Sequence, residues 1–276
     1  MTRVVARTAM FNKTSLAVVW KHRSLLGALI KRDFLNRYTG SVAGAAWAFL
    51  NPLALLVLYA VVFEAIFRVK VPNLSLDQPY VLFIAVVLWP WMAFQEGLSR
   101  GTTAILNHGA LVKKVAFEHE LLVYSAVITS FMVHSLGYAL VLCVLAVMGF
   151  HLHLQGLFMA LLLMPALMVL SCGLALLLSA MQVFIRDVEQ ILSQALSVLF
   201  YATPILFPMS MVPDWLAQVM QLNPLGHVTE PLRNNWLGQT PFAYQDAGLA
   251  WLLALICLAS GRWIFLRLSP YFEDMV

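Results

Sequence analysis

The sequence has little charge. Asp, Glu, Lys and Arg make up 11% of its 276 residues, whereas soluble domains carry about 25%. Hydrophobic residues make up 62%, and they come in long continuous blocks rather than at the spacing of a half-buried helix or strand. Low charge and long apolar blocks exclude an ordinary soluble domain and predict one domain embedded in a membrane.

Cysteine is scarce as well. Cys143, Cys172 and Cys257 all lie within apolar blocks, and their odd number argues against a disulfide framework, so we interpret them as small packing residues. Residues 1–20 alternate basic and apolar positions, without the continuous apolar core and small-residue cleavage site of a secretory signal. We therefore expect the N-terminus to stay in the cytoplasm.

Familiar catalytic motifs are missing. No G-x-x-x-x-G-K-[ST] stretch occurs, so the chain has no conventional loop for ATP phosphates, and the energy for any ATP-driven process must come from another chain. No D-x-D, H-E-x-x-H or G-x-S-x-G occurs either, which counts against a polytopic glycosyltransferase or acyltransferase. His151 and His153 are too few ligands for a metal site. We expect no catalytic residue and no metal or cofactor in this chain.

Six apolar blocks are long enough to be membrane-crossing helices. A helix needs roughly 20 apolar residues to cross a hydrocarbon core of about 30 Å, because each residue rises only about 1.5 Å. The blocks predict an all-α polytopic membrane protein with spans at residues 44–67, 80–98, 121–150, 157–181, 191–207 and 248–268. Residues 1–43 would form a basic leader, and residues 44–276 the membrane domain.

The distribution of basic residues orients these spans. If both termini are cytoplasmic, only Arg68, Lys70 and Arg233 of the 17 Lys and Arg residues fall in outer segments. Short basic loops stay on the cytoplasmic side of a membrane. We therefore predict a multi-pass protein with both ends in the cytoplasm. Its net charge of +4 would reflect topology and contact with anionic membrane lipids, not nucleic acid.

The basic leader contains a helical pattern. Leu26, Ile30 and Phe34 recur at four-residue spacing, while basic residues such as Lys31 and Arg32 take other positions. This pattern predicts an amphipathic interface helix with its apolar face at the headgroup boundary and its basic residues near anionic phosphates. The alternative is a simple basic leader that only sets the topology.

Two segments that connect predicted spans contain apolar residues and predicted short helices. Residues 99–120 are the longest cytoplasmic connection, and their first half can form a short helix with Ile105 and Leu106 on one side; the apolar residues favour a docking surface over an ordinary solvated loop. Residues 208–245 predict two short helices, at 215–222 and from 225 towards 236. Each is too short to cross, so we expect the pair to re-enter the outer leaflet and line a pore mouth.

Few polar residues interrupt the apolar blocks. We interpret Glu64 as an interfacial carboxylate paired with Arg68, and Glu96 as part of a polar end near Arg100. His134 is interpreted as a packing hydrogen-bond partner rather than a proton relay. Aromatic residues are interface anchors by default. Sugar C–H faces stack on such rings, however, so seven are candidates for a channel lining: Tyr59, Phe63, Trp89, Trp91, Phe94, Phe200 and Tyr201.

Four stretches resemble the membrane subunits of type-2 ABC exporters that handle polysaccharides, namely the O-antigen, capsule and teichoic-acid export permeases. They are RDFLNRYTGSVAGAAWAFLNPL (32–53), WPWMAFQEGLSRGTTAILNHGALVKKVAFEHELL (89–122), FIRDVEQILSQALSVLFYATPILFP (184–208) and LNPLGHVTEPLR (222–233). They follow the family order over almost the whole chain, between the six predicted spans.

The resemblance implies a homodimer in the bacterial inner membrane that encloses a channel. Two separate ATP-binding cassette subunits would attach to it and bind ATP and Mg. The substrate would be a glycan on a polyprenyl diphosphate, or another lipid-anchored glycan. The ATPase contacts would be Arg100, Ile105, Leu106, Asn107, Leu111, Lys113, Lys114, Arg186 and Asp187. Lys31, Arg32 and Arg37 would frame the cytoplasmic entrance, and the outer gate would comprise Pro204, Pro208, Trp215, Asn223, Pro224 and Arg233.

Two other functions remain open. A type-2 ABC exporter of a drug or a smaller lipid shares the same architecture, and fold does not fix function. A polytopic membrane glycosyltransferase or acyltransferase is the second alternative, weakened by the missing catalytic motifs.

Overall fold

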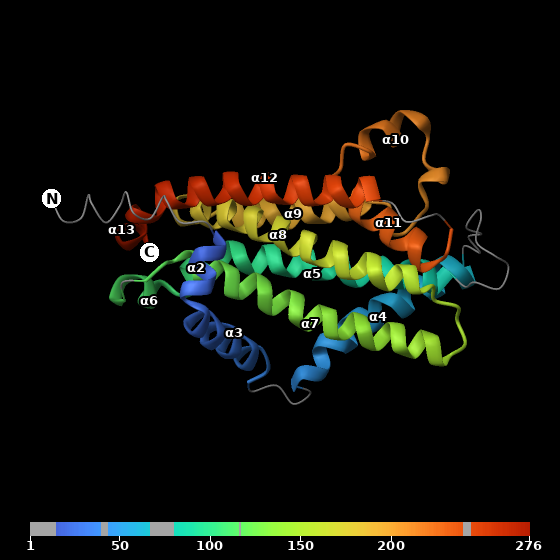
Figure 1. The fold of residues 1–276 in the computed structure, drawn as a ribbon, viewed down its shortest axis with the longest axis horizontal. Helices are drawn as coiled ribbons and strands as arrows, with labels where there is room; N and C mark the ends of the chain where they lie inside the picture. Colours follow the sequence, from blue (N-terminus) through green and yellow to red (C-terminus); the bar gives the residue numbers. More distant parts are fainter. Residues whose placement is uncertain (1–14, 40–43, 67–79, 116, 240–243) are drawn as a thin grey trace.

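The computed structural model describes residues 15–39, 44–66, 80–115, 117–239 and 244–276. Within these ranges every regular element is helical (Figure 1). Among the described residues, four helices are long and apolar enough to cross a membrane. They are α5 (Tyr80–Asn107), α7 (Glu120–Val147), α8 (Leu154–Phe184) and α12 (Tyr244–Leu268). The all-helical class is therefore confirmed, and a helix that is long and apolar enough to cross a membrane lies at each of the predicted spans 80–98, 121–150, 157–181 and 248–268.

The other two predicted spans are shorter or less regular. In the first, a 3-10 turn η1 (Gly44–Ala46), α4 (Trp47–Ala60) and the wide π-helical segment η2 (Val61–Ile66) follow one another without a break. The next, predicted at 191–207, contains α9 (Val188–Tyr201), which ends shortly before Pro204. A residue that precedes proline is disfavoured in helical conformation, so the helix stops there. The count of six crossings stays a prediction.

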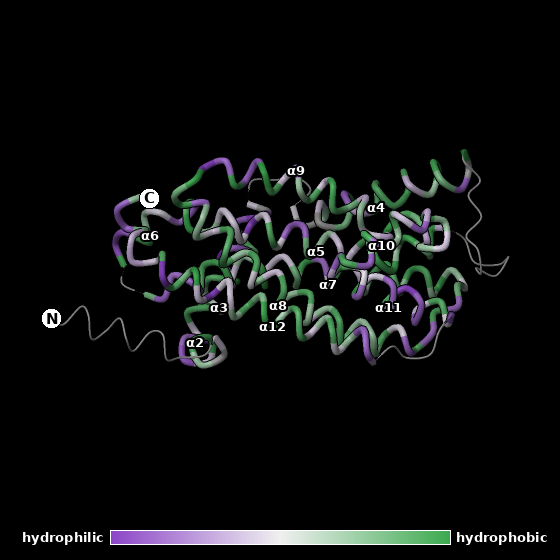
Figure 2. The backbone as a smooth tube through the Cα atoms, turned by 90° about the horizontal axis from the view of Figure 1, so that it is seen from above, coloured by the Kyte–Doolittle hydropathy of each residue, from purple (hydrophilic) through white to green (hydrophobic). Residues whose placement is uncertain are grey.

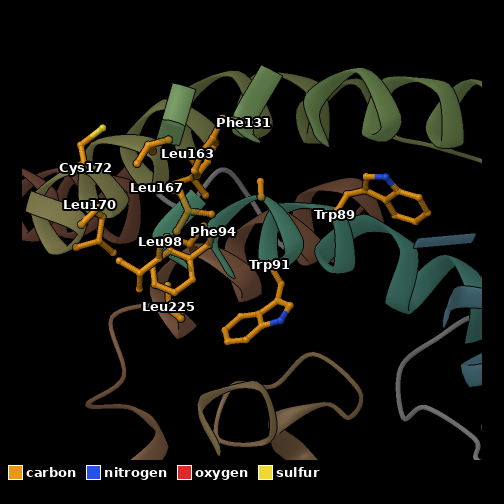
Figure 3. Packing of buried hydrophobic residues seen from close by; sticks show 14 of the residues in the cluster. Trp89, Trp91, Phe94, Leu98, Phe131, Leu163, Leu167, Leu170, Cys172 and Leu225 are labelled. Carbon is orange, nitrogen blue, oxygen red and sulfur yellow. The ribbon is translucent and has the colours of Figure 1, made fainter. Parts of the chain in front are cut away.

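Helix α5 is the centre of the bundle. It packs against α7 on one side and α8 on the other, and α12 covers the far side of α8 (Figure 1). Trp89, Phe94 and Leu98 of α5 belong to the same buried cluster as Phe131 of α7 and Leu163 of α8 (Figure 3). The residues of α5 from Leu82 to Trp91 are all buried, as expected for a helix that is covered on every face.

Helix α5 also continues past its predicted end at residue 98. Residues 99–107 contain no proline, and Ala104 and Ile105 extend the buried face, so the helix runs on to Asn107. The first half of the predicted 99–120 loop is therefore an extension of the span rather than a separate helix. The short helix α6 (Gly109–Lys114) follows directly after His108.

Helices α8 and α12 approach each other backbone to backbone. A Cβ atom added to Gly261 would lie 2.0 Å from the carbonyl oxygen of Gly173. A Cβ atom added to Gly173 would lie 2.5 Å from the backbone of Cys257. Small residues permit this distance between membrane helices, where close packing replaces the hydrophobic effect as the source of helix association.

The bundle has two different ends, which we name after their short helices. The α6 end carries α6, α2 (Ser15–Lys21), the start of α3 (Arg23–Tyr38), η4 (Ser269–Tyr271) and α13 (Phe272–Met275). The α11 end carries η3 (Met209–Met211), α10 (Asp214–Met220) and α11 (Gly226–Trp236). Hydrophilic stretches lie at both ends of the bundle, around α6 and around α11, and hydrophobic ones dominate the middle (Figure 2). Helices α10 and α11 lie where two short helices were predicted; their insertion into a leaflet stays a prediction.

The amphipathic leader is helical but packs differently from the expectation. Leu26 and Leu29 of α3 are buried in the core cluster, and α3 lies against α7. Protein therefore covers this part of the apolar face that we expected at the lipid headgroups. Lys31 and Arg32 on the same helix remain exposed.

Candidate functional site

A cluster of charged residues joins three helices in the half of the bundle nearer α6. Arg37 of α3 donates a hydrogen bond from Nη1 to Oε1 of Glu96 on α5 at 2.7 Å, and its Nη2 donates to Ser130 Oγ on α7, also at 2.7 Å. His134 Nε2 lies 2.7 Å from Oε2 of the same glutamate. One carboxylate therefore holds groups from all three helices together.

A second carboxylate completes the cluster. Arg100 of α5 donates from Nη2 to Asp33 Oδ1 at 2.9 Å, and Asp33 also lies 3.6 Å from the Arg37 guanidinium. The two arginines and the two acids sum to zero charge. Charged groups at membrane depth are costly unless they pair or face a cavity, and this arrangement does both, because a groove opens beside it.

The groove lies between α3, α4, α5 and α7 and has a volume of about 540 Å³. Arg37, Glu96, Arg100 and His134 form its charged wall. The side chains of Glu96 and Arg100 are 35% and 38% exposed, so both reach the groove, whereas those of Arg37 and His134 are 5% exposed. The buried side chains of Arg37 and His134 fix the positions of the charged groups. The partly exposed side chains of Glu96 and Arg100 are available to a ligand.

The α6 end brings most of the predicted ATPase contacts together. Asn107, Lys113 and Lys114 are exposed at the end of α5 and on α6, and Arg186 and Asp187 are exposed in the turn after α8. The side chains of Ile105, Leu106 and Leu111 pack into the core instead. They therefore stabilise the helices that carry the exposed contact residues. Arg100 belongs to the charged cluster described above.

The C-terminal helix braces the same end. Phe272 of α13 is fully buried, with Phe265 at 5.3 Å, Phe184 at 6.2 Å and His119 at 6.3 Å between ring centroids. The last residue, Val276, lies so close to Gly109 that a Cβ atom there would be 2.3 Å from it. Burial lowers the pKa of the His119 imidazole, and the nearby Glu273 carboxylate opposes that shift.

The predicted entrance residues divide into two groups. Lys31 and Arg32 project from the exposed side of α3, whereas Arg37 turns inward to Glu96. Exposed basic groups on a short helix suit an anionic lipid surface. Arg37 instead fixes α3 to the spans.

Six of the seven aromatic candidates form one chain of contacts. Phe200 lies at the centre, 6.1 Å from Tyr59, 5.5 Å from Trp91 and 5.3 Å from Tyr201 between ring centroids. Phe63 extends the chain beyond Tyr59, and Phe94 beyond Trp91. Trp89 is separate: it is fully buried against Gly137 of α7, where a Cβ atom would lie 2.6 Å from the indole Nε1.

At the α11 end, Arg233 is a buried connector. Its Nε donates to the carbonyl oxygen of Phe83 at 3.2 Å and its Nη2 to that of Ile205 at 2.8 Å, while the guanidinium lies 3.8 Å from the centre of the Phe83 ring. Tyr80 donates to the carbonyl oxygen of Leu206 beside it. These bonds fasten the segment after α9 to the start of α5.

The other predicted gate residues surround that segment. The Asn223 amide donates to the Ala202 carbonyl at 3.2 Å and to Thr203 Oγ1 at 2.8 Å, and its oxygen accepts from the amide of Leu225 at 3.0 Å. Pro204 is buried and Pro208 half-buried, whereas Trp215 and Pro224 are exposed. Asn223 and Arg233 thus hold the two sides of one loop.

The comparison with known families decides what kind of protein carries this geometry. Residues 24–237 match the family described as ABC-2 type transporter, a stretch that runs from α3 to the end of α11. The chain belongs to the ABC-2 type transporter family. As an ABC-2 chain it is a membrane component of a transporter rather than a catalytic one.

Several relatives of this ABC-2 chain are curated. The O-antigen export system permease protein RfbA of Klebsiella pneumoniae is 24% identical over 252 residues, which cover 91% of this chain and 95% of the relative. RfbA of Myxococcus xanthus is 30% identical over 213 residues, 75% of this chain and 78% of the relative. The polysialic acid transport protein KpsM of Escherichia coli is 24% identical over 204 residues, 74% and 77% respectively.

Sequence reasoning did not find the partners in the charged cluster of this ABC-2 chain. It placed Glu96 at a polar helix end near Arg100 and interpreted His134 as a packing hydrogen-bond partner, but it joined neither residue to Arg37 or Asp33. A signal was present. Asp33 and Arg37, Glu96 and Arg100, and Ser130 and His134 are each four residues apart, so each pair shares one helix face.

Glu64 does not belong to the charged cluster that the structure describes. Glu64 is exposed on η2, and its predicted partner at position 68 lies outside the described residues. Within the part of the chain that the structure describes, no three His, Cys, Asp or Glu residues lie close enough to hold a metal ion.

Proposed function

We propose that this chain forms, with a second copy of itself, the membrane passage of an ATP-driven exporter of lipid-linked polysaccharide across the bacterial inner membrane. The observation that carries the proposal is the relationship over most of the chain to ABC-2 relatives named for O-antigen export and polysialic acid transport. The chain has no ATP-binding loop of its own, so separate ATP-binding cassette subunits supply the energy.

The passage lies between two copies rather than through one. Large buried side chains such as Trp89, Phe94 and Phe131 fill the centre of the bundle around α5 (Figure 3). A hydrophilic polymer needs a water-filled path, because unsatisfied polar groups are costly in lipid. Helices α4 and α9 present exposed apolar residues, including Val57, Ile191 and Val198, that a second copy covers.

The α6 end receives the force. In this proposal it faces the cytoplasm, and the ATPase contacts Lys113, Lys114 and the turn at Arg186. Helix α5 has 28 residues and is therefore about 42 Å long, so a push at α6 is transmitted along one continuous helix to Tyr80 and the α11 end. The bonds of Arg233 to Phe83 and Ile205 connect that movement to the outer gate.

Reversal of the exposed charges on α6 tests the proposal. Lys113→Glu combined with Lys114→Glu replaces the two basic side chains of the last turn of α6 without touching the core. We expect the ATPase to bind about tenfold more weakly, which equals about 1.4 kcal/mol, and export of lipid-linked glycan to fall in cells. Lys21→Glu, at an exposed site on α2, is the matched control.

Measurements of ATPase binding, of the exported molecule and of transferase activity separate the alternative functions. Unchanged ATPase binding and export in the α6 variant would remove the coupling role of these lysines. If the cells export a lipid without a glycan, the chain is instead an ABC-2 exporter of a smaller lipid. If the purified chain transfers sugar or acyl groups without any ATPase, it is an enzyme.

A further inference from the structure

The groove beside the charged cluster has the chemistry of a ligand site. Besides Glu96 and Arg100, it is lined by Trp47 and Asn51 of α4 and by Gln95 of α5. Trp47 is 50% exposed, and Asn51 and Gln95 are exposed as well. An aromatic plate beside a few converging polar groups is the usual composition of a small-molecule site.

The charges of this groove favour an uncharged polar ligand over an anion. Both arginines already have an acidic partner: Arg100 lies 2.9 Å from Asp33, and Arg37 lies 2.7 Å from Glu96. An anion beside Arg100 would be repelled by the Asp33 and Glu96 carboxylates, which lie 2.9 Å and 3.9 Å from this guanidinium. A hydroxyl group both donates and accepts, so it can bond to a carboxylate and a guanidinium without separating them.

The polar groups around the groove match a ligand with several hydroxyls. The Glu96 carboxylate accepts, the Arg100 guanidinium donates, and the amides of Asn51 and Gln95 do both. The oxygen of Gln95 already accepts from Trp91 Nε1 at 2.9 Å, which fixes this side chain in place. A held amide loses less conformational entropy when a ligand binds.

The Trp47 indole supplies the apolar side of the groove. It lies there with Pro52, Leu55 and Met92. A pyranose ring has an apolar C–H face and a rim of hydroxyls, so it can cover the indole and reach the amides and the carboxylate at once. A phosphate group has no apolar face to place on this side.

We propose that this groove binds one sugar ring of the transported glycan, with the ring on Trp47 and its hydroxyls bonded to Asn51, Gln95 and Glu96. This inference rests on the proposed export function. The groove lies in the half of the bundle nearer α6, on the side we assign to the cytoplasm, where a lipid-linked glycan enters. The site therefore distinguishes a lipid that carries sugar from one that does not, before the chain is moved.

Two matched lipids test the site. The probes are a polyprenyl diphosphate that carries a single N-acetylhexosamine and the same polyprenyl diphosphate without sugar. The chain is assembled with its ATPase in lipid nanodiscs, and the binding of each lipid and its stimulation of ATP hydrolysis are measured. We expect the sugar-bearing lipid to bind about tenfold more tightly, a difference typical of a few well-placed contacts.

Substitutions in α4 test whether the groove causes the difference in affinity between the two lipids. Trp47→Ala and Asn51→Ala should each reduce the preference for the sugar-bearing lipid to near one and leave the affinity for the bare lipid unchanged. Leu50→Ala is the control, since Leu50 is exposed on the same helix but does not line the groove. If Trp47→Ala fails to assemble, Asn51→Ala carries the test, because it removes only a small exposed side chain.

The outcomes separate this site from the export function. If wild-type protein binds both lipids equally, or if the preference survives in Asn51→Ala, the groove is not a sugar site, while export by the transporter stands. If neither lipid binds or stimulates ATP hydrolysis, both the site and the export of lipid-linked glycan are overturned.

Discussion

Arg262 of α12 binds both carboxylate oxygens of Glu120 at the start of α7, with Nε at 2.7 Å and Nη2 at 3.1 Å. The Tyr124 hydroxyl donates to the same carboxylate at 3.2 Å. Glu120 is 1% exposed and lies 142 positions from Arg262 in the sequence. This pair joins two spans that are far apart in the chain, at the end that we assign to the ATPase.

Breaking this pair should destabilise the fold more than replacing both partners. Either Glu120→Leu or Arg262→Met removes one side of this buried ion pair, which costs about 3–5 kcal/mol. The double variant removes both charges, so its loss should be clearly smaller than the sum of the two single losses. Thermal unfolding of the four proteins in detergent measures the coupling energy. Additive losses would show that the two charges act independently.

The contact between α8 and α12 should tolerate no side chain at Gly261. A Cβ atom at this position meets the Gly173 carbonyl oxygen at 2.0 Å, so Gly261→Ala must push two backbones apart. Overpacking of this kind costs about 1–3 kcal/mol. Gly248→Ala on the same helix is the control, because nothing lies within 4 Å of its added Cβ, and its unfolding temperature should stay near that of wild type. Equal unfolding temperatures for both variants would mean that the helices are not in backbone contact.

The long spans could be predicted from the sequence because each is a local property. An apolar block such as residues 157–181 needs no knowledge of its neighbours to be recognised as a membrane helix. The shape of the stretch from Gly44 to Ile66 and the continuation of α5 to Asn107 depend on packing, and composition alone did not reveal them.

The site was less predictable because its partners are distant in sequence. His134 and Glu96 are separated by 38 positions, and Arg37 and Ser130 by 93. Spacing within one helix shows which residues share a face, but it does not show which helix that face meets. The same limit explains why Arg233 could be assigned to the outer gate while its bonds to the carbonyl groups of Phe83 and Ile205 were not foreseen.

Acid should loosen the C-terminal brace through His119. Because burial lowers the pKa of His119 in the folded protein, the neutral ring contributes stability above the ordinary histidine pKa of about 6.5. That contribution is lost as the pH falls below this value and through the lower pKa of the folded protein. The protection factors of residues 272–276 against hydrogen exchange, which correct for the slower intrinsic exchange in acid, should therefore fall between pH 7.5 and pH 5.5. His119→Phe should remove this dependence and keep the ring contact with Phe272. The same loss of protection in His119→Phe would assign the effect to other groups, such as Glu273.

Arg233 should be irreplaceable in its connecting role. Arg233→Lys keeps the positive charge, but a lysine ammonium is a point charge without the planar fork that reaches two carbonyl groups in different directions. One of the Phe83 and Ile205 carbonyl groups then loses its donor, and a hydrogen bond from a charged group contributes about 1.5–3 kcal/mol. We expect the hydrogen-exchange rate of residues 203–212 to rise by about tenfold, because a loss of about 1.4 kcal/mol of local stability makes opening about tenfold more frequent. The centre of α8 should stay protected. Arg267→Lys is the control, because Arg267 is exposed and contacts only the face of Trp263, at 3.7 Å, among the contacts the structure describes for it. If both variants exchange like wild type, the fork of Arg233 does not fasten the outer segment to α5, and Tyr80 together with Asn223 holds it instead.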